Sequence, residues 1–357
     1  MTDITKRGLL GGTAALATAA ILPWRSAAAQ AAQELPAHER PLYEAAQREG
    51  ELTWYTGQLQ AEPSEAVGRA FTERYPGVRC NVVRTTSQVA FQRLSQDARA
   101  RVAQCDVFSS TDYSHFTFLK GEGRLLAYKP QNAAGMVKGA RDAADPDGHF
   151  QITYLALYML ARRSDRLSEA EAPKSWRELT DPKWKDKLAV GHPGFSGAIG
   201  NWAIMMRQAY GEEFFKQLER NKPQIGRSAG DPVTTLNSGE RLVGVGIPSA
   251  ATLFSISRGN PLALIYPTDG TLMVPSPSAA IANAPKPNAA KLFMEFVCGP
   301  AYSRTVREFY AESLRPEVPP PEGARPLDEI KLITPTPQQI ENEMVEVKEL
   351  WRDTFGV

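Results

Sequence analysis

Residues 194–200 hold the side chains and amide groups of this sequence that are best suited to bind an anion. They read Gly-Phe-Ser-Gly-Ala-Ile-Gly and open an apolar run that is typical of a helix. The first amide groups of a helix have no acceptor inside it, and they lie at the positive end of its dipole. Such a helix start holds phosphate, phosphonate or carboxylate without a Lys or Arg. We therefore expect Ser196, Gly197 and Ala198 to bind an anion; the simpler interpretation is that Ser196 only caps the helix.

No recognised catalytic motif occurs in the sequence. It contains neither a Gly-x-x-x-x-Gly-Lys-[Ser/Thr] loop nor a His-Glu-x-x-His motif, and Ser196 does not fit the Gly-x-Ser-x-Gly pattern of serine hydrolases. The four histidines lie far apart, without the spacing of metal ligands. We expect no catalytic residue, no metal site and no cofactor. A secreted hydrolase that uses Ser196 is the alternative from another functional class.

The elements that must position these groups alternate between strand and helix. Strand-like runs at 52–56, 78–83 and 106–108 are rich in β-branched and aromatic residues. The helical patterns that follow them are at 62–75, 87–103 and 113–120. This order predicts a parallel sheet with right-handed crossovers, and therefore an α/β fold.

Hydroxyl side chains follow the three predicted strands. Ligands of parallel sheets bind beyond the carboxyl ends of the strands, and these ends are poor in charged residues. We therefore expect hydroxyl donors to a ligand from Thr56, Thr86, Ser87, Ser110 and Thr111.

The second half of the chain repeats the alternation. An apolar run at 150–161 predicts one long strand, and a polar loop at 227–228 contains an Arg and a Ser. Further strands are expected at 188–190, 242–247, 262–266 and 273–281, and helices at 196–206, 212–218, 249–258, 289–297, 301–310 and 337–353. This half therefore predicts a second α/β unit.

A few polar residues of this half stand where chain segments would pass between the two units. Tyr154 and Tyr266 are suited to stack on a ligand or to bond it; packing in the core is the equally open alternative. We expect Ser249 and Asp269 to line the same region, with Asp269 available to pair an amine.

The N-terminus has the pattern of an export signal. Lys6-Arg7 precedes an apolar stretch at 8–23 that is shorter than a membrane span, and Ala27-Ala28-Ala29 offers a cleavage site. Removal of residues 1–29 changes the formal net charge from +1 to about −1. We expect a protein that is exported to the periplasm after cleavage near Ala29, with no affinity for nucleic acid.

The three cysteines are not spaced as a disulfide framework. Cys80 lies in a strand-like run, Cys105 opens another, and Cys298 lies in a helical pattern. An odd number leaves at least one free thiol. We interpret all three as small buried hydrophobic residues.

Several short segments, in this order, resemble the solute-binding proteins of bacterial ABC importers, in the branch that contains the ferric-iron-binding proteins. They are Gly-Glu-Leu-Thr-Trp-Tyr-Thr-Gly at 50–57, Cys-Asp-Val-Phe at 105–108, Phe-Ser-Gly-Ala at 195–198 and Pro-Lys-Pro-Asn-Ala-Ala-Lys-Leu-Phe at 285–293. The resemblance covers nearly all of the chain after the export signal.

The resemblance implies a two-lobed periplasmic binding protein of type II topology, with the ligand cleft between lobes that close by a hinge motion. Residues 34–152 and 268–318 would form the first lobe, and residues 153–267 and 319–357 the second. In that topology two strands flank the first strand, which would hold Cys80 and Cys105 about 9.6 Å apart, beyond the reach of a disulfide.

Iron-binding relatives use a His, an acid and a pair of tyrosines as ligands. The matching positions here are Leu59, Gln88 and the segment 249–251 (Ser-Ala-Ala), none of which offers the anionic oxygen that Fe³⁺ prefers. We therefore expect a monomeric receptor that captures a small anionic organic solute (a phosphonate, a phosphorylated compound or a carboxylate) and delivers it to an ABC permease and its ATPase. An iron carrier that uses a synergistic anion is the alternative within the family.

Overall fold

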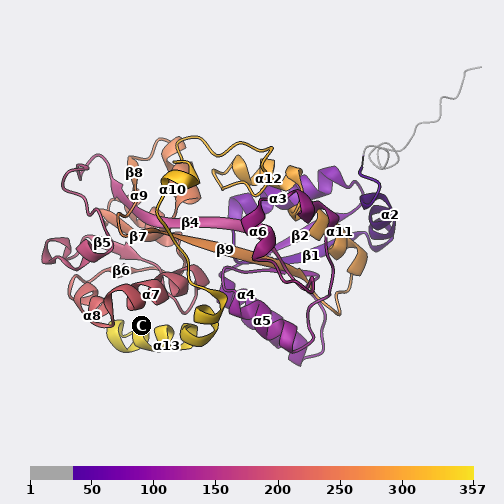
Figure 1. Ribbon diagram of the computed structural model, residues 1–357, viewed down its shortest axis with the longest axis horizontal. Coiled ribbons are helices and arrows are strands. Elements are labelled where there is room, and N and C mark those ends of the chain that lie inside the picture. Colours follow the sequence, from indigo (N-terminus) through magenta and orange to yellow (C-terminus); the bar gives the residue numbers. More distant parts are fainter. Residues whose placement is uncertain (1–34) are drawn as a thin grey trace, which may run out of the picture.

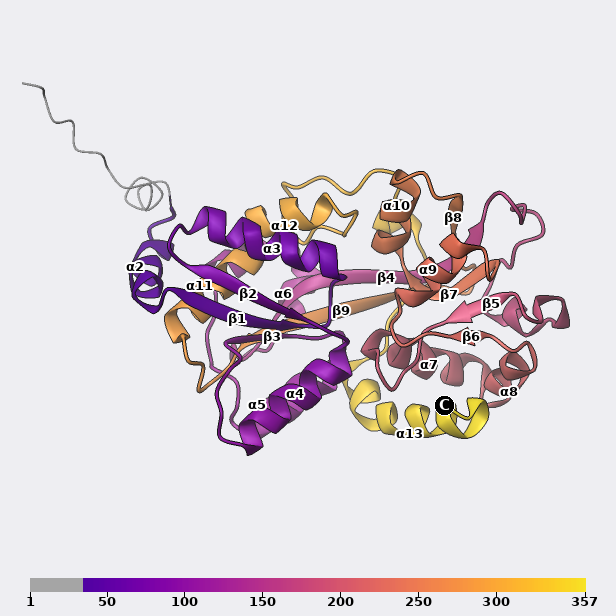
Figure 2. The same cartoon turned by 180° about the vertical axis from the view of Figure 1, so that it is seen from behind.

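One continuous sheet runs through the whole molecule and has helices on both faces (Figures 1 and 2). A computed structural model describes residues 35–357; the expected export signal at 1–29 lies outside these residues. The strand order is β2-β1-β3-β9-β4-β7-β5-β6, with β10 paired to β9 and β8 paired to β4. The predicted α/β class is confirmed.

The first lobe is built on the parallel strands β1 (Glu51–Thr56), β2 (Arg79–Arg84) and β3 (Val107–Ser109). Both β2 and β3 pair with β1, as the type II topology requires. Its helices are α2 (Glu39–Glu49), α3 (Ala61–Arg74), α4 (Ser87–Arg99), α5 (Ser114–Gly121), α6 (Lys138–Asp142), α11 (Pro287–Val297) and α12 (Pro300–Arg307). Cys80, Cys105 and Cys298 are free thiols, and the latter two are buried.

The second lobe repeats this plan around β5 (Leu188–Val190), with β6 (Gln224–Ile225) and β7 (Val243–Pro248) parallel to it on either side. The short strands β8 (Leu262–Ile265) and β10 (Leu332–Ile333) extend the sheet. Its helices are α7 (Gly197–Tyr210), α8 (Glu213–Arg220), α9 (Asp231–Ser238), α10 (Ser249–Ser257) and α13 (Pro337–Phe355). Helix α9 and strand β6 were not expected from the sequence.

Two long strands connect the lobes. β4 (Gln151–Arg163) and β9 (Thr271–Ala280) run antiparallel through the centre of the molecule, as Figure 1 shows. The pairing register shifts between Ile152 and Tyr154, and Pro275 and Pro277 of β9 lie opposite Leu155 and Ile152. Both strands were predicted, each within a few residues of its observed ends.

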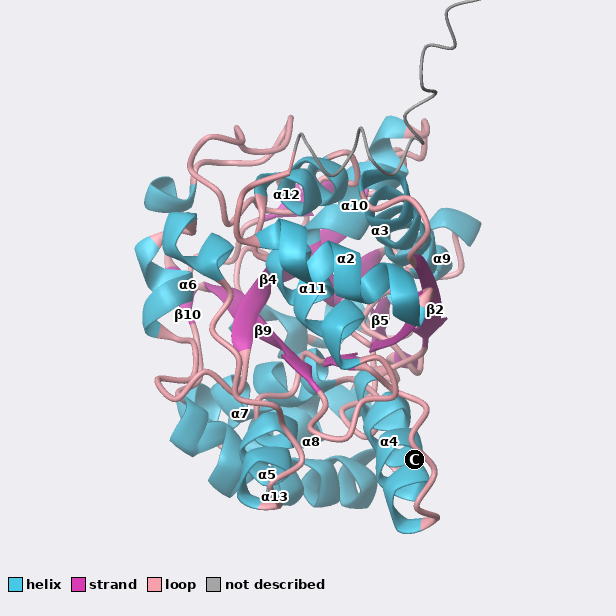
Figure 3. Cartoon of the chain, turned by 90° about the vertical axis from the view of Figure 1, so that its right-hand side faces the viewer, coloured by secondary structure: helices cyan, strands magenta, loops and turns pink. Residues whose placement is uncertain are grey.

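Aromatic side chains fix the C-terminal helix to the second lobe. α13 buries Met344, Val347 and Trp351 on one face, and Trp351 contacts the rings of Trp202 on α7 and Phe215 on α8. This one-sided apolar pattern is why the segment forms a helix that packs rather than a free tail. In Figure 3, which shows the molecule from the right-hand side of Figure 1, helices lie above and below the strands. Among residues 35–357 no helix combines the length and apolar character needed to cross a membrane.

Candidate functional site

A cavity of about 220 Å³ lies between the two lobes. Its wall combines residues of the first lobe, the second lobe and the connecting strand β4. The lining residues are Gly57, Gln58, Leu59, Gln60, Glu62, Pro63, Arg84, Thr86, Ser87, Thr111, Tyr154, Tyr158, Ser196, Ser228, Ala229, Pro248, Ala250, Ala251, Phe254, Phe309 and Ala311.

Four helices begin at the wall of this cavity. Gln60, Thr86, Ser196 and Pro248 are the residues that immediately precede α3, α4, α7 and α10, and all four line the cavity. Only α7 is capped by a side chain, because the Ser196 hydroxyl accepts a hydrogen bond from the Ile199 amide at 3.4 Å. The other three helix starts have no side-chain cap. The positive dipole ends of these helices therefore lie at the cavity, although the Gln88 amide of α4 donates to the carbonyl oxygen of Phe195 at 3.5 Å.

The close approach of β1 to α4 requires a glycine. A Cβ added at Gly57 would lie 2.5 Å from both the Cα and the amide nitrogen of Ser87. Gly57 thus lets the end of β1 lie against the start of α4, and both form part of the same wall. The close contact between β1 and α4 at the cavity wall therefore depends on a residue without a side chain at position 57.

Few charged groups face the cavity, and those that do have partners. Arg84 donates to the carbonyl oxygen of Leu59 at 3.0 Å and to the Gln60 side chain at 2.9 Å, and burial lowers its pKa. Glu62 pairs with Arg258 across the two lobes at 3.3 Å. Unpartnered polar atoms remain on the wall nonetheless. The oxygen Oε1 of Gln58 and the hydroxyl of Thr86 are buried and, among the described residues, have no hydrogen-bond partner.

Five of the site residues expected from the sequence line the cavity: Thr86, Ser87, Thr111, Tyr154 and Ser196. They come from α4, the loop after β3, strand β4 and the start of α7. The structure therefore brings residues together that lie 110 positions apart in the chain, from 86 to 196. Burial raises the pKa of Tyr154 well above its ordinary value, so its hydroxyl stays protonated.

Four other expected residues are held just behind this wall. Thr56 is fully buried at the end of β1, and the Ser110 hydroxyl lies 2.9 Å from Nδ1 of His115. A Cβ at Gly197 would lie 2.7 Å from the Cβ of Asp112, so this glycine packs against the first lobe, and Ala198 is buried. The Ser196 amide donates to the carbonyl oxygen of His192 at 2.9 Å. The Ser196 amide, which we expected to bind the anion, is therefore already bonded within the chain.

The two remaining expected residues also lie outside the lining. Ser249 is buried at the first position of α10, next to Pro248. Asp269 accepts hydrogen bonds from the Tyr210 hydroxyl at 2.6 Å and the Arg177 amide at 3.2 Å. It therefore fastens the loop between β8 and β9 to Tyr210 and Arg177 of the second lobe, and it does not line the cavity.

The sequence analysis missed Tyr158, Gln58 and the apolar rings of Phe254 and Phe309. Tyr158 lies four residues after Tyr154 on β4, and residues an even number apart on a strand share one face. That spacing was a usable signal. The two phenylalanines contact each other with ring centroids 5.4 Å apart, although they lie 55 positions apart in the chain. No local sequence pattern predicts that these two rings are in contact.

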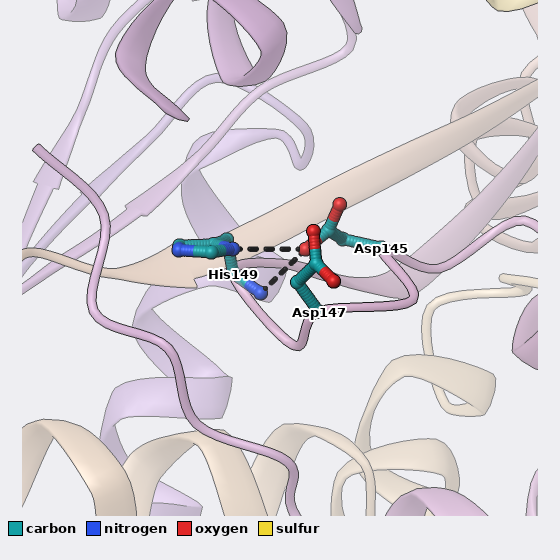
Figure 4. A group of neighbouring side chains, drawn as sticks. All are labelled: Asp145, Asp147 and His149. Carbon is teal, nitrogen blue, oxygen red and sulfur yellow. Dashed lines mark hydrogen bonds and ion pairs between the residues drawn. The ribbon is translucent and has the colours of Figure 1, made fainter. Parts of the chain in front are cut away.

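The positions that would match iron ligands offer none in the structure. Leu59, Ala250 and Ala251 present apolar groups to the cavity, and the Gln88 amide donates to Asp112 at 2.7 Å. One cluster of possible metal ligands does occur among the described residues, formed by Asp145, Asp147 and His149 (Figure 4).

This cluster is already occupied by a side-chain cation. The Lys120 ammonium lies 2.6 Å from the Asp145 carboxylate and 2.7 Å from that of Asp147. His149 donates its amide to Asp145 at 2.9 Å. Lys120 thus provides the positive charge that a metal ion would supply. We interpret the cluster as an ion-pair network of the first lobe.

The comparisons with known proteins now define the class. The family model "Bacterial extracellular solute-binding protein" matches residues 104–336. The chain belongs to this family, whose members are binding proteins that serve ABC transporters. An uncharacterised protein of Haemophilus influenzae is 26% identical over 240 residues, which is 65% of this chain and 68% of that protein.

Solved structures share the fold. The periplasmic binding protein AfuA from Actinobacillus pleuropneumoniae, with exogenous fructose-6-phosphate bound, superposes with a TM-score of 0.78 at 22% identity, over 87% of this chain and 99% of that one. Iron-bound HitA from Pseudomonas aeruginosa gives 0.73 at 20% identity, over 85% and 99%. These proteins are two-lobed periplasmic binding proteins, which confirms the expected fold. One of them holds a sugar phosphate and the other iron.

Proposed function

We propose that this protein is a periplasmic receptor for a small anionic organic solute, such as a phosphonate, a phosphorylated compound or a carboxylate. It releases the solute to an ABC permease and its ATPase in the inner membrane. The export signal at 1–29 is removed near Ala29, and the receptor acts as a monomer. Residues 34–152 and 268–318 form one lobe and residues 153–267 and 319–357 the other.

The observation that carries this proposal is the convergence of helix starts on one cavity. α3, α4, α7 and α10 all begin at its wall, and three of them lack a side-chain cap. A helix start without a side-chain cap carries about half a positive charge, which favours an anion beside it. With Arg84 as the basic group on the lining, the field in the cavity favours negative charge.

A ferric cargo fits this wall less well. Tyr154 and Tyr158 are the phenols on the lining, and burial raises the pKa of both, which opposes the phenolate form that Fe³⁺ binds. Glu62, the acid on the lining, pairs with Arg258. The relatives that hold iron and those that hold a sugar phosphate share the fold, so the residues of the cavity must decide between these cargoes.

The test begins with a thermal-shift screen against phosphonates, sugar phosphates, dicarboxylates and ferric citrate. A solute at 100 times its dissociation constant stabilises a protein by about 2.7 kcal/mol, which such a screen detects. We then substitute Ala250, at the second position of uncapped α10. Ala250→Asp places a carboxylate where we expect the solute's negative charge, and it should weaken binding by about 100-fold or more.

The matched control is Ala250→Asn, which has the same shape without the charge. It should lose far less affinity than Ala250→Asp, while the apo form of the Asp variant stays folded because an acid stabilises a helix start. Equal losses in both variants would show that charge at this helix start is irrelevant. A visible charge-transfer band with ferric citrate, strengthened in the Asp variant, would replace the proposal with the iron carrier.

A further inference from the structure

The polar groups of the cavity wall gather on one side of the sheet. The hydroxyls of Ser87 and Thr111 lie 2.9 Å apart, and the Gln88 amide donates to the carbonyl oxygen of Phe195, the residue before Ser196. These groups belong to the loop after β3 and to the starts of α4 and α7. Both helices lie below the sheet in Figures 1 and 2. The polar lining is therefore concentrated where α4 meets α7.

The opposite side of the wall is mainly apolar. Helices α3, α10 and α12 lie above the sheet in the same two figures. Among the lining residues that these helices and their flanking segments contribute, six present hydrocarbon surface: Leu59, Pro63, Ala251, Phe254, Phe309 and Ala311. A group of the solute that enters this side therefore contacts carbon atoms rather than hydrogen-bonding partners.

The two phenylalanine rings come from different lobes. Phe254 belongs to α10 of the second lobe and Phe309 follows α12 of the first, and their ring centroids lie 5.4 Å apart. The Arg258 guanidinium lies 4.7 Å from the centroid of the Phe254 ring and pairs with Glu62 across the lobes at 3.3 Å. The charged groups beside the rings thus bind each other, which leaves the rings to the solute.

Helix α10 relates this apolar side to the expected position of the anion. Ala250, Ala251 and Phe254 all line the cavity, and residues three and four positions apart share one face of a helix. At a rise of 1.5 Å per residue, Phe254 lies about 6 Å along the helix from Ala250, beside which we place the negative charge. The apolar side therefore begins about one helical turn from the anionic head of the solute.

The size of the cavity limits what can lie there. An apolar cavity of about 150 Å³ is large enough to bind benzene. The cavity of about 220 Å³ in this protein therefore accommodates roughly one ring, or an alkyl group of similar size, together with a small anionic head.

We propose that the solute carries a compact hydrocarbon group, alkyl or aryl, about one helical turn from its anionic head, and that Phe254 and Phe309 select this group. The inference rests on the proposed function, because the helix starts hold the negative end. A solute with several hydroxyls at the same position, such as the hexose of a sugar phosphate, would lose hydrogen bonds to water that the apolar side does not replace.

Pairs of probes that share an anionic head test this proposal by calorimetry at pH 8. They are methylphosphonate with phenylphosphonate, methyl phosphate with phenyl phosphate, and acetate with phenylacetate. For the head that fits, the wild-type protein should bind the phenyl compound at least about 10-fold more tightly, because the ring is removed from water. Glucose 1-phosphate should bind at least about 10-fold more weakly than phenyl phosphate.

The variants Phe254→Ala and Phe309→Ala connect this preference to the two rings. Each should reduce the ratio of phenyl to methyl affinity by at least about threefold. An altered balance between open and closed lobes would change both affinities by the same factor, so the ratio reports the contact with the ring. Phe118→Ala is the control, because Phe118 on α5 is 51% exposed and does not line the cavity; it should keep the wild-type ratio.

The outcomes separate this inference from the function on which it rests. If the anions bind but the phenyl compounds gain nothing, if glucose 1-phosphate binds more tightly than phenyl phosphate, or if both alanine variants keep the ratio, the inference falls and the anion receptor stands. If none of the anions binds, both are overturned.

Discussion

Two buried carboxylates, those of Asp112 and Glu312, differ in whether they have hydrogen-bond and ion-pair partners. Asp112, in the loop after β3, accepts from the Gln88 amide at 2.7 Å and from Ser114 at 2.6 Å, and its carboxylate lies 3.8 Å from the Lys348 ammonium of α13. Glu312, the chain neighbour of the lining residue Ala311, has no such partner among residues 35–357. Both are more than nine-tenths buried, so burial alone does not explain the difference.

The pKa of Asp112 is lowered and the pKa of Glu312 is raised. Burial would raise the pKa of Asp112, but His115, Lys348 and the hydrogen bonds from Ser114 together lower it. For Glu312 only burial acts, and the pKa rises to about 7. A satisfied buried charge holds two parts of the structure together, whereas an unsatisfied one is a cost that a functional site retains for its ligand. The pair therefore contrasts a carboxylate that cross-links the structure with one whose burial no partner offsets.

The largest effect is expected when the satisfied carboxylate is removed. Asp112→Ala leaves the donors of Gln88, Ser114 and Lys348 without their acceptor, and it should lower the free energy of unfolding by about 3 kcal/mol. Urea denaturation at pH 7 measures this change. Asp147→Ala is the control, because that carboxylate is 66% exposed and should cost less than about 0.5 kcal/mol. Similar losses in both variants would contradict the structural role of Asp112.

The opposite sign is expected at the unsatisfied carboxylate. Glu312→Gln should raise the stability of the ligand-free protein at pH 8 by on the order of 2 kcal/mol, since a carboxyl pKa raised from 4.5 to about 7 reflects at most about 3 kcal/mol. Between these pH values the folded state keeps a proton that the unfolded state has released, so wild-type stability falls as pH rises through this window. At pH 4 the two proteins should be equally stable.

Urea midpoints at pH 4, 6 and 8 follow this difference. The gap between variant and wild type should widen with pH. A variant that is less stable than the wild type at pH 8 would mean that Glu312 has a stabilising partner.

A smaller effect is expected at His115, which stacks on Phe91 beside Asp112. Burial lowers its pKa from 6.5 to about 4, so the folded state excludes a proton that the unfolded state binds. Stability should therefore fall as the pH drops from about 6.5 to 4, and His115→Phe should reduce this fall by about 1 to 2 kcal/mol. Chemical denaturation at pH 7 and pH 4.5 gives the slope, and an unchanged slope in the variant would exclude His115 as its source.

The sequence was a good guide to the fold because local patterns determine most of its elements. The runs that predict β1 and β4 combine β-branched or aromatic residues with clear ends, and the helix α13 shows its apolar stripe. Helix α9 was missed although Pro232 at its start and Gly239 at its end are ordinary signals for a helix. The two-residue strand β6 has no pattern long enough to detect.

The site was harder to predict, and the reason is long-range packing. Hydroxyl groups at strand ends led to Thr86, Ser87 and Thr111, since the topology of parallel sheets fixes where those ends meet. Nothing in the sequence around Glu312 distinguishes it from the many other acids. Its burial comes from tertiary packing, which no local pattern specifies. The same is true of Asp269, whose partners Tyr210 and Arg177 lie 59 and 92 residues away.

The prolines of β9 bear on how the receptor moves. Proline has no amide hydrogen, so Pro275 and Pro277 leave gaps in the ladder of hydrogen bonds where β9 passes from one lobe to the other, opposite the register shift beside Tyr154. Bending at this point would therefore break fewer backbone bonds between β4 and β9 than bending through a stretch without proline. A solute that contacts Tyr154 would therefore lie directly against the segment where we expect the two strands to bend.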